Sequence, residues 1–373
     1  MKQNLYTFPL ALFLFLCTAC TQADIVMPVA GSDGGDGGKD KGVPLSVKNL
    51  GLSVEIETRS LVTGGPVGSD TNPNPLTQVG LCVTKQSSSG SVSVYASGNN
   101  TQMFTYNTAT PAWELAEGEE ALYLYSEKGT VYAYSPADKS VSLSGTPKVP
   151  VMSSVKVSEK QNFVFNDGGG VVDAATDVLW NTDQDDYLYC TASDQVDRWQ
   201  PEVSLTMRHA LAKVSFRILE ADGGTAFDGF HVAKVVLKSS AGFKKSTSAK
   251  LNLSTGELSG TLTPVSQLTF TADGNMRAVG TGVNEPARVP VQAFGLVIPV
   301  TGVSVTLELT LDDGRVFTMS PPEGSADPGT FTADWVKGNN YIYNIRMLPQ
   351  GIVIADMEVA GWNDGGSTDI PVE

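Results

Sequence analysis

The stretch PEVSLTMRHALAKVSFRIL, residues 201–219, decides the fold, because its apolar side chains change sides part-way along. They occupy odd positions in the first half and even positions in the second: Leu205, Met207 and Leu211, then Ala212, Val214, Phe216 and Ile218. Side chains of a strand alternate between its two faces, so this change of parity turns the buried face over. We therefore predict that the chain pivots here, through a bulge or a transfer from one sheet to another.

Short strands are predicted on both sides of the pivot. Gly, Asn, Asp or Pro separates most of the apolar or alternating runs before it, at residues 79–83, 92–96, 121–125, 131–134, 141–143, 162–165 and 187–191. Further runs follow it at 232–237, 303–311, 317–319 and 352–359. Ser-Thr-Gly-Glu at 254–257 and Asp-Asp-Gly-Arg at 312–315 predict hairpins. The chain is therefore predicted to be all-β.

Length and charge set further bounds. A chain of 373 residues is long for one core, so we expect two tandem β-sandwich domains, an N-terminal one at 47–200 and a C-terminal one at 201–373. The formal net charge is −15, and the sequence has no basic stripe. This excludes nucleic acid as a partner, because there is no surface to replace the counterions of a phosphate backbone.

The first residues follow the pattern of an export signal. Lys2 precedes an apolar run at 5–16 that is too short to span a bilayer as a helix. The sequence Cys-Thr-Ala-Cys at 17–20 resembles a bacterial lipobox, with Cys20 as the lipidated residue. We interpret 1–19 as a lipoprotein signal peptide and 20–46, which contains the Gly- and Asp-rich run 31–42, as a flexible tether. An ordinary secretory signal cut nearby is the alternative.

Five short motifs, in order along the chain, carry a resemblance to a known family. They are VYAYSP at 131–136, DVLW at 177–180, HALAKVSF at 209–216, GNNYIYNI at 338–345 and Gly-Trp at 361–362. Together they resemble the fimbrillins, the Mfa-like (type V) pilin lipoproteins of anaerobic Gram-negative bacteria. The resemblance implies two transthyretin-like domains. It also implies a non-enzymatic fimbrial subunit that is carried to the cell outer membrane, exposed on the surface and active in adhesion.

The resemblance also implies how such a subunit is assembled. Fimbrillin precursors are cut after an arginine by an arginine-specific protease, which would act here between Arg59 and Ser60. The alternating run 52–59 would then be the strand that leaves its groove, through the apolar side chains of Leu52, Val54 and Ile56. The strand donated to a neighbouring subunit would be 352–359, through Ile352, Ile354, Met357 and Val359. The simpler interpretation of Arg59 is a charged residue at a strand end.

The implied partners are other pilin subunits, the outer membrane through the lipid anchor, the protease, and ligands on host or bacterial surfaces. The resemblance implies no cofactor. A surface glycan-binding lipoprotein that does not polymerise is the alternative function, and exposed aromatic side chains forming a sugar platform would favour it.

Residues with metal or catalytic chemistry are few. His209 and His231 lack a partner at metal-ligand spacing, so each is expected to be structural, and we predict neither a metal site nor a catalytic one. The acidic loop with Asp183, Asp185 and Asp186 fits calcium binding less well than a solvated surface. Cys82 and Cys190 either form one disulfide or stay as buried thiols.

Overall fold

A computed structural model describes residues 41–52, 76–96, 101–165, 180–192, 194–319, 329–349, 351–361 and 367–370. Within these ranges the chain forms strands, turns and two short 3₁₀ turns, Ala221–Gly223 and Pro286–Arg288, and no α-helix. The all-β prediction is confirmed. The sites predicted at Cys20, Val54, Ile56, Arg59 and Ser60 lie outside the described residues.

The first sheet has eight strands and takes most of its chain from the N-terminal half. Its order is β2 (Ser46–Leu52), β14 (Glu202–His209), β13 (Leu188–Thr191), β8 (Gly129–Ser135), β3 (Gln78–Gln86), β5 (Thr101–Asn107) and β6 (Ala112–Leu115), and β4 (Val92–Val94) joins β3. Two residues of β1 (Val43–Pro44) pair with β7 (Tyr123–Leu124) beside it. One apolar core, here called the first core, lies against this sheet and draws from 45–133 and 188–207.

Two further sheets share a second core. The ten-stranded sheet runs β12 (Trp180–Thr182), β11 (Lys160–Phe165), β18 (Thr263–Ala272), β16 (Val232–Asn252), β10 (Val149–Val157), β9 (Val141–Ser144), with β17 (Leu258–Ser259), β20 (Val300–Leu311), β21 (Val316–Thr318) and β22 (Phe331–Trp335) branching from it. The five-stranded sheet runs β19 (Ala293–Val297), β15 (Ala212–Glu220), β23 (Asn339–Leu348), β24 (Gly351–Gly361), β25 (Ser367–Ile370).

The pivot is a transfer between sheets, as the change of parity predicts. Strand β14 buries its odd residues in the first core, whereas β15 belongs to the five-stranded sheet and buries its even residues in the second. Only Ala210 and Leu211 separate the two strands, and both are buried in the second core. The chain therefore passes from one core to the other without a linker.

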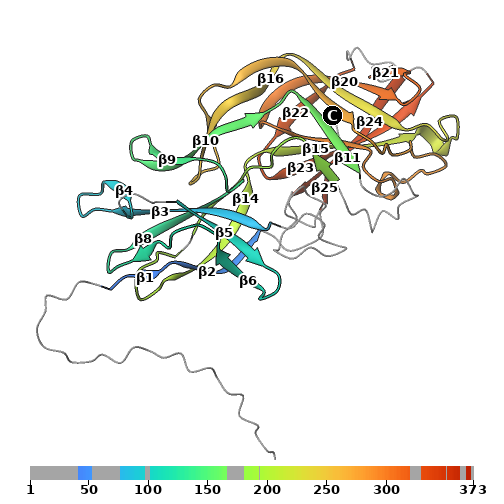
Figure 1. Ribbon diagram of the computed structural model, residues 1–373. Coiled ribbons are helices and arrows are strands. Elements are labelled where there is room, and N and C mark those ends of the chain that lie inside the picture. Colours follow the sequence, from blue (N-terminus) through green and yellow to red (C-terminus); the bar gives the residue numbers. More distant parts are fainter. Residues whose placement is uncertain are drawn as a thin grey trace, which may run out of the picture. The chain divides into compact units, whose positions relative to one another are not determined.

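The sheets divide the chain differently from the predicted boundary at 200/201. Strand β14, which follows that boundary, pairs with β13 and β2 in the first sheet. Strands β9 to β12, which precede it, join the ten-stranded sheet, where β10 pairs with β16 and β11 pairs in parallel with β18. Figure 1 shows β10 and β11, in green, beside strands coloured yellow and orange. Hydrophobic pattern alone cannot reveal a sheet built from segments this far apart in sequence.

Cys82 and Cys190 are both buried, on opposite faces of the first sheet, and neither is in a disulfide. Cys82 pairs across the ladder with Tyr132, and Cys190 pairs with Ala133. Residues directly opposite each other share a face, and Tyr132 and Ala133, being consecutive, point to different faces. The thiols therefore enter different cores and no disulfide joins them. Burial raises the pKa of Cys190, which keeps that thiol protonated.

Candidate assembly site

Strands β1 and β2 hold the start of the described chain against the first core. The N–H of Leu45 donates to the carbonyl of Leu122 at 2.9 Å, and the N–H of Ser46 donates to the carbonyl of Pro201 at 3.0 Å. Strand β2 then runs parallel to β14 as the last strand on its side of the sheet. Its outer edge has no strand paired with it among the described residues.

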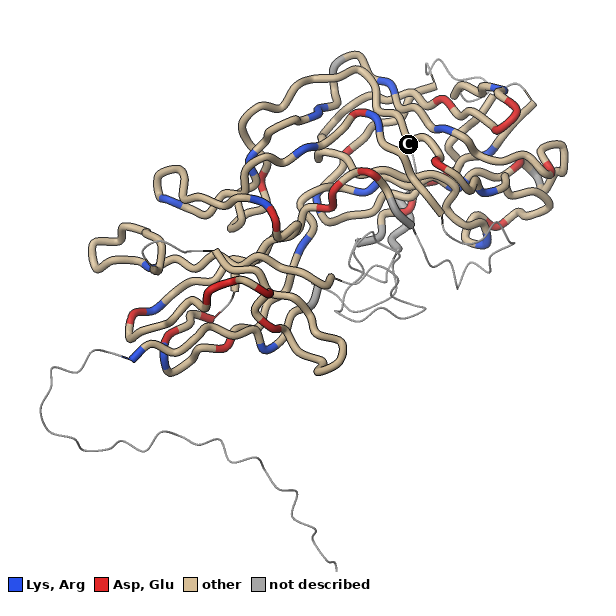
Figure 2. Tube along the Cα trace, in the orientation of Figure 1, with Lys and Arg blue, Asp and Glu red and all other residues tan. Residues whose placement is uncertain are grey.

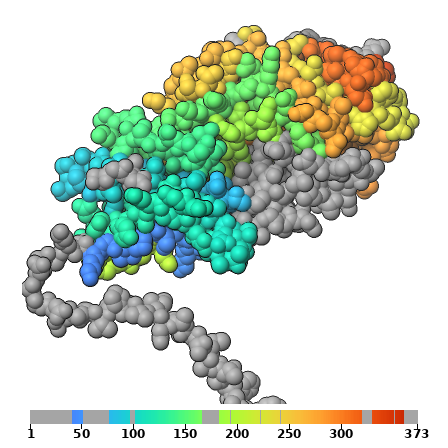
Figure 3. Space-filling view, in the orientation of Figure 1, coloured from blue at the N-terminus to red at the C-terminus, as the bar shows by residue number. Residues whose placement is uncertain are grey.

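Three apolar side chains fasten this segment: Leu45, Val47 and Leu50 are 5%, 6% and 7% exposed. Val47 and Leu50 have opposite parity, and both are buried because the register with β14 shifts after Val47. Strand β2 also contacts β6, the strand at the other end of the same sheet, so it helps to close the sheet around the first core. Figure 3 shows the segment, in blue, at the molecular surface.

Of the strand predicted at 52–59, only Leu52 is among the described residues. Leu52 is the last residue of β2, opposite Met207, and the strand before it begins at Ser46. The sequence pattern missed this part because the register shift interrupts the period of two on which strand prediction rests. The observed β2 therefore overlaps the predicted segment at Leu52.

The residues of the predicted donor strand lie in β24. This strand pairs antiparallel with β23 along its whole length and with β25 on its other side. Ile352 is 1% exposed, and Ile354, Met357 and Val359 are partly buried against the second core. In this state β24 is an interior strand of its own sheet.

A polar cluster on the opposite face of β24 also fixes that strand. Arg217 Nη1 donates to Glu358 Oε1 at 2.8 Å, and Asn344 Nδ2 donates to the same oxygen at 3.0 Å. The Arg217 and Glu358 side chains are only 17% and 16% exposed. One contact thus links three neighbouring strands, β15, β23 and β24.

We expect Glu358→Ala to lower the free energy of unfolding by about 1.5–3 kcal/mol, because the mostly buried Arg217 guanidinium loses a charged hydrogen-bond partner. Urea unfolding measures the change. Glu358→Gln is the matched control, since an amide oxygen still accepts from Asn344. The double variant with Arg217→Ala should cost less than the sum of the single changes, and strict additivity would contradict a direct interaction.

The histidines and the acidic loop form separate structural contacts. His209, 1% exposed, lies with Nδ1 3.0 Å from Asp186 Oδ1. Asp183 accepts from the N–H of Asn162 at 2.9 Å, and Asp185 accepts from the hydroxyl of Tyr187 at 3.1 Å. Each carboxylate of the loop thus has its own partner. Among the described residues no group of three or more His, Cys, Asp or Glu could hold a metal ion.

His231 lies near the surface, with Nδ1 2.9 Å from Asp312 Oδ2. Partial burial alone would raise the pKa of Asp312, but its hydrogen bonds with His231 outweigh that effect and lower it. The pair joins the Asp312 turn to the start of β16, next to His231.

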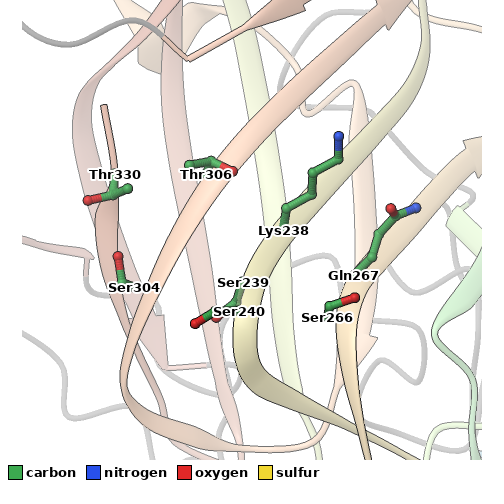
Figure 4. A pocket seen from close by; sticks show the side chains of 8 residues that line it. All are labelled: Lys238, Ser239, Ser240, Ser266, Gln267, Ser304, Thr306 and Thr330. Carbon is green, nitrogen blue, oxygen red and sulfur yellow. The ribbon is translucent and has the colours of Figure 1, made fainter. Parts of the chain in front are cut away.

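A hollow with a volume of about 400 Å³ lies where β16 bulges between Lys238 and Phe243. Figure 4 shows its lining, which is hydroxyl-rich and includes Ser304 and Thr306, with Lys238 at one side. No aromatic ring lines it. Lys238 is the charged residue in the described lining, and its ammonium group is already paired with Glu308.

Charge is likewise not concentrated. Figure 2 shows lysines and arginines scattered among acidic residues along the described trace, with no continuous basic stripe. None of the described helices is long and apolar enough to cross a membrane.

Comparison with known proteins identifies relatives. The model of a fimbrillin-like family matches residues 67–362. No curated protein is significantly similar in sequence. Among solved structures, a proposed cell adhesion protein from Bacteroides uniformis is 17% identical, with 86% of this chain and 98% of that chain covered and a TM-score of 0.49. A proposed cell adhesion protein from Bacteroides ovatus is 16% identical, with 90% of this chain and 99% of that chain covered and a TM-score of 0.49. A fimbrial protein from Bacteroides vulgatus is 15% identical, with 85% of this chain and 99% of that chain covered and a TM-score of 0.39.

Proposed function

The chain belongs to the fimbrillin-like family, and we propose on that basis that it is a structural subunit of a cell-surface fimbria. In this proposal it is exported as a lipoprotein anchored in the outer membrane through Cys20. An arginine-specific protease cuts it between Arg59 and Ser60. It then polymerises with other pilin subunits by strand exchange, and the fimbria serves adhesion. The subunit has no catalytic role.

The observation that carries the proposal is the position of β2. It is an edge strand whose Val47 and Leu50 fill the first core, and it ends at Leu52, shortly before Arg59. While the chain is intact, the covalent link keeps β2 at a high effective concentration beside its groove. After a cut at Arg59 the segment is a separate peptide, and once it dissociates dilution opposes its return.

The vacated groove would need a replacement strand. Removal of β2 leaves the outer edge of β14 without backbone partners and exposes the apolar groups that Val47 and Leu50 covered. A strand from a second subunit satisfies both needs by β-augmentation. The C-terminal segment with Ile352, Ile354, Met357 and Val359 is our proposed donor, and it must first leave β23 and the contact of Glu358 with Arg217.

Two domains remain part of the proposal, with the division following the cores. The first would comprise the eight-stranded sheet, including β14, and the second would comprise the other two sheets, including β9 to β12. Strand exchange would then change the first domain at β2 and use a strand from the second domain of a neighbour.

Replacing Arg59 with Ala tests the processing step. After treatment with an arginine-specific protease, the wild-type chain should yield a form beginning at Ser60 that assembles into detergent-resistant ladders on gels. Arg59→Ala should remain uncut at this site and monomeric, because its β2 stays tethered to the groove.

Arg59→Lys, treated in parallel with a lysine-specific protease, should restore both cleavage and ladders. Ladders of equal intensity from uncut Arg59→Ala would refute the proposal that this cut controls assembly.

A further inference from the structure

Three of the five large apolar side chains most exposed among the described residues are aromatic: one lies in β7, and the other two lie in the segments that follow β7 and precede β14. Tyr123 and Tyr125 are 50% and 42% exposed, and Trp199 is 69% exposed. The N–H of Arg198 donates to the carbonyl of Tyr125 at 2.9 Å, which brings the turn carrying Trp199 beside the tyrosines. We call these three residues the aromatic platform.

The backbone beneath the platform is fixed. The Tyr95 hydroxyl accepts from the N–H of Tyr125 at 2.9 Å, and Tyr95 itself is 3% exposed. Asp197 Oδ1 accepts from the N–H groups of Trp199 at 2.8 Å and Gln200 at 2.9 Å. Rigid positioning lowers the entropy cost of binding, because the site does not have to become ordered when a ligand binds.

The two tyrosines flank a buried leucine. Tyr123 lies in β7 and Tyr125 directly follows that strand, while Leu124 between them is fully buried. Gly42 lies against both of them: a Cβ added there would be 2.8 Å from Tyr123 Cβ and 3.1 Å from the ring of Tyr125. The main chain therefore passes closely along one side of the pair, while both tyrosines stay exposed.

The surrounding charges favour a neutral ligand. Glu127, two residues after Tyr125, is paired with Lys85 at 2.6 Å, and the Asp197 carboxylate is occupied by the turn. The Arg198 guanidinium lies 5.4 Å from the centre of the Trp199 ring. Anionic lipids and nucleic acids bind through clusters of basic groups, whereas Lys85 is paired here with Glu127 and Arg198 lies against Trp199.

The size and chemistry of the platform favour a carbohydrate. Three rings cover far less than the roughly 800 Å² per partner of a stable protein interface. Tyrosine and tryptophan present an apolar face and a polar tip, which suits a molecule that has both C–H faces and hydroxyl groups. A sugar ring is such a molecule.

We propose that the aromatic platform of Tyr123, Tyr125 and Trp199 binds a neutral polysaccharide. The pyranose rings lie on the aromatic faces, and their hydroxyls reach the phenol and indole tips. This gives the uncut subunit an adhesive site of its own. The inference concerns the uncut chain and does not depend on cleavage at Arg59.

Affinity electrophoresis tests the inference. The uncut chain is run through native gels that contain yeast mannan, xylan or laminarin as probes. We expect at least one of these neutral polysaccharides to retard the wild-type protein and Trp199→Ala to lose at least tenfold in affinity. Tyr123→Ala with Tyr125→Ala should cause a similar loss. Because these side chains are exposed, the melting temperatures of the variants should match the wild type.

Val316→Ala and Val336→Ala are the matched controls, since both side chains are 57% exposed elsewhere on the molecule. Both should bind like the wild type. No retardation by any of the three polysaccharides would overturn the inference. Unchanged affinity of Trp199→Ala, or binding to phosphatidylglycerol vesicles in place of the polysaccharides, would also overturn it.

Discussion

Replacing Leu50 with Asp is expected to release β2 from the first sheet while the rest of the chain stays folded. Leu50 is 7% exposed in the first core, and a carboxylate without a partner costs several kcal/mol at such a position. Among the described residues strand β2 lies at a sheet edge and pairs with β14 alone, so detachment removes the charge from the core at the loss of one short ladder. The variant would mimic the state that follows cleavage without any protease.

Hydrogen exchange measures this release. Amides of 46–52 should lose protection by a factor of at least 100, as should those of β14 that face them, while protection in β8 and β3 persists. A synthetic peptide with the sequence of 351–361, GIVIADMEVAG, should then bind Leu50→Asp but not the uncut wild type. Asn49→Asp is the control, because it adds the same charge on the exposed side of the same strand. Full protection of β2 in Leu50→Asp would show that this strand is not separable.

Replacing Trp335 with Ala should produce the largest loss of stability among single substitutions in the second core, about 3–5 kcal/mol. The indole is 1% exposed and stacks on Phe243, with ring centres 5.7 Å apart and planes 3° apart. Its Nε1 donates to the Tyr343 hydroxyl at 2.8 Å. Alanine would leave a cavity and also remove a partner from a buried hydroxyl.

Urea unfolding followed by circular dichroism measures this effect. Trp335→Phe keeps most of the ring contact and should cost less, mainly the lost hydrogen bond. Val336→Ala, at an exposed neighbouring position, should stay within about 0.5 kcal/mol of the wild type. A loss below 1 kcal/mol for Trp335→Ala would mean that the second core is less tightly packed than these contacts imply.

Local signals in the sequence predict part of this structure well. The alternating run before Asp312 and the return after Arg315 form β20 and β21, paired with Leu309 opposite Phe317. Gly314 has φ of +86°, a conformation that glycine adopts readily. The hairpin predicted at 254–257 joins β16 to β17. In each case one short segment contains both the strand pattern and the turn chemistry.

Strands interrupted by irregular pairing were not predictable in this way. Strand β16 is one strand of 21 residues, yet its register with β18 shifts between Lys238 and Phe243, so the sequence shows it as two unrelated runs. Strand β10 was missed altogether; its register with β16 shifts twice, and Ser154 within it has φ of +62°. A bulge changes which face a residue occupies, and period-two patterns cannot follow that change.

The candidate site shows the same limit. The C-terminal apolar run was visible as a strand, but its contact with Arg217 joins residues 141 positions apart and leaves no local signature. Exposed aromatic residues are equally hard to recognise, because Tyr123 and Trp199 look like core residues until their surroundings are known. Both the contact with Arg217 and the exposure of these aromatic residues depend on which distant segments lie next to each other.

The direct passage from β14 to β15 has a mechanical consequence. A flexible linker between two folded regions stretches under tension and delays the moment at which either region bears load. Here Ala210 and Leu211 are both buried, so there is no slack between the cores. A force applied to the part of the chain around one core is therefore transmitted directly to the hydrogen bonds around the other core. How long the molecule withstands that pull depends on its unfolding rate under force and not on its equilibrium stability.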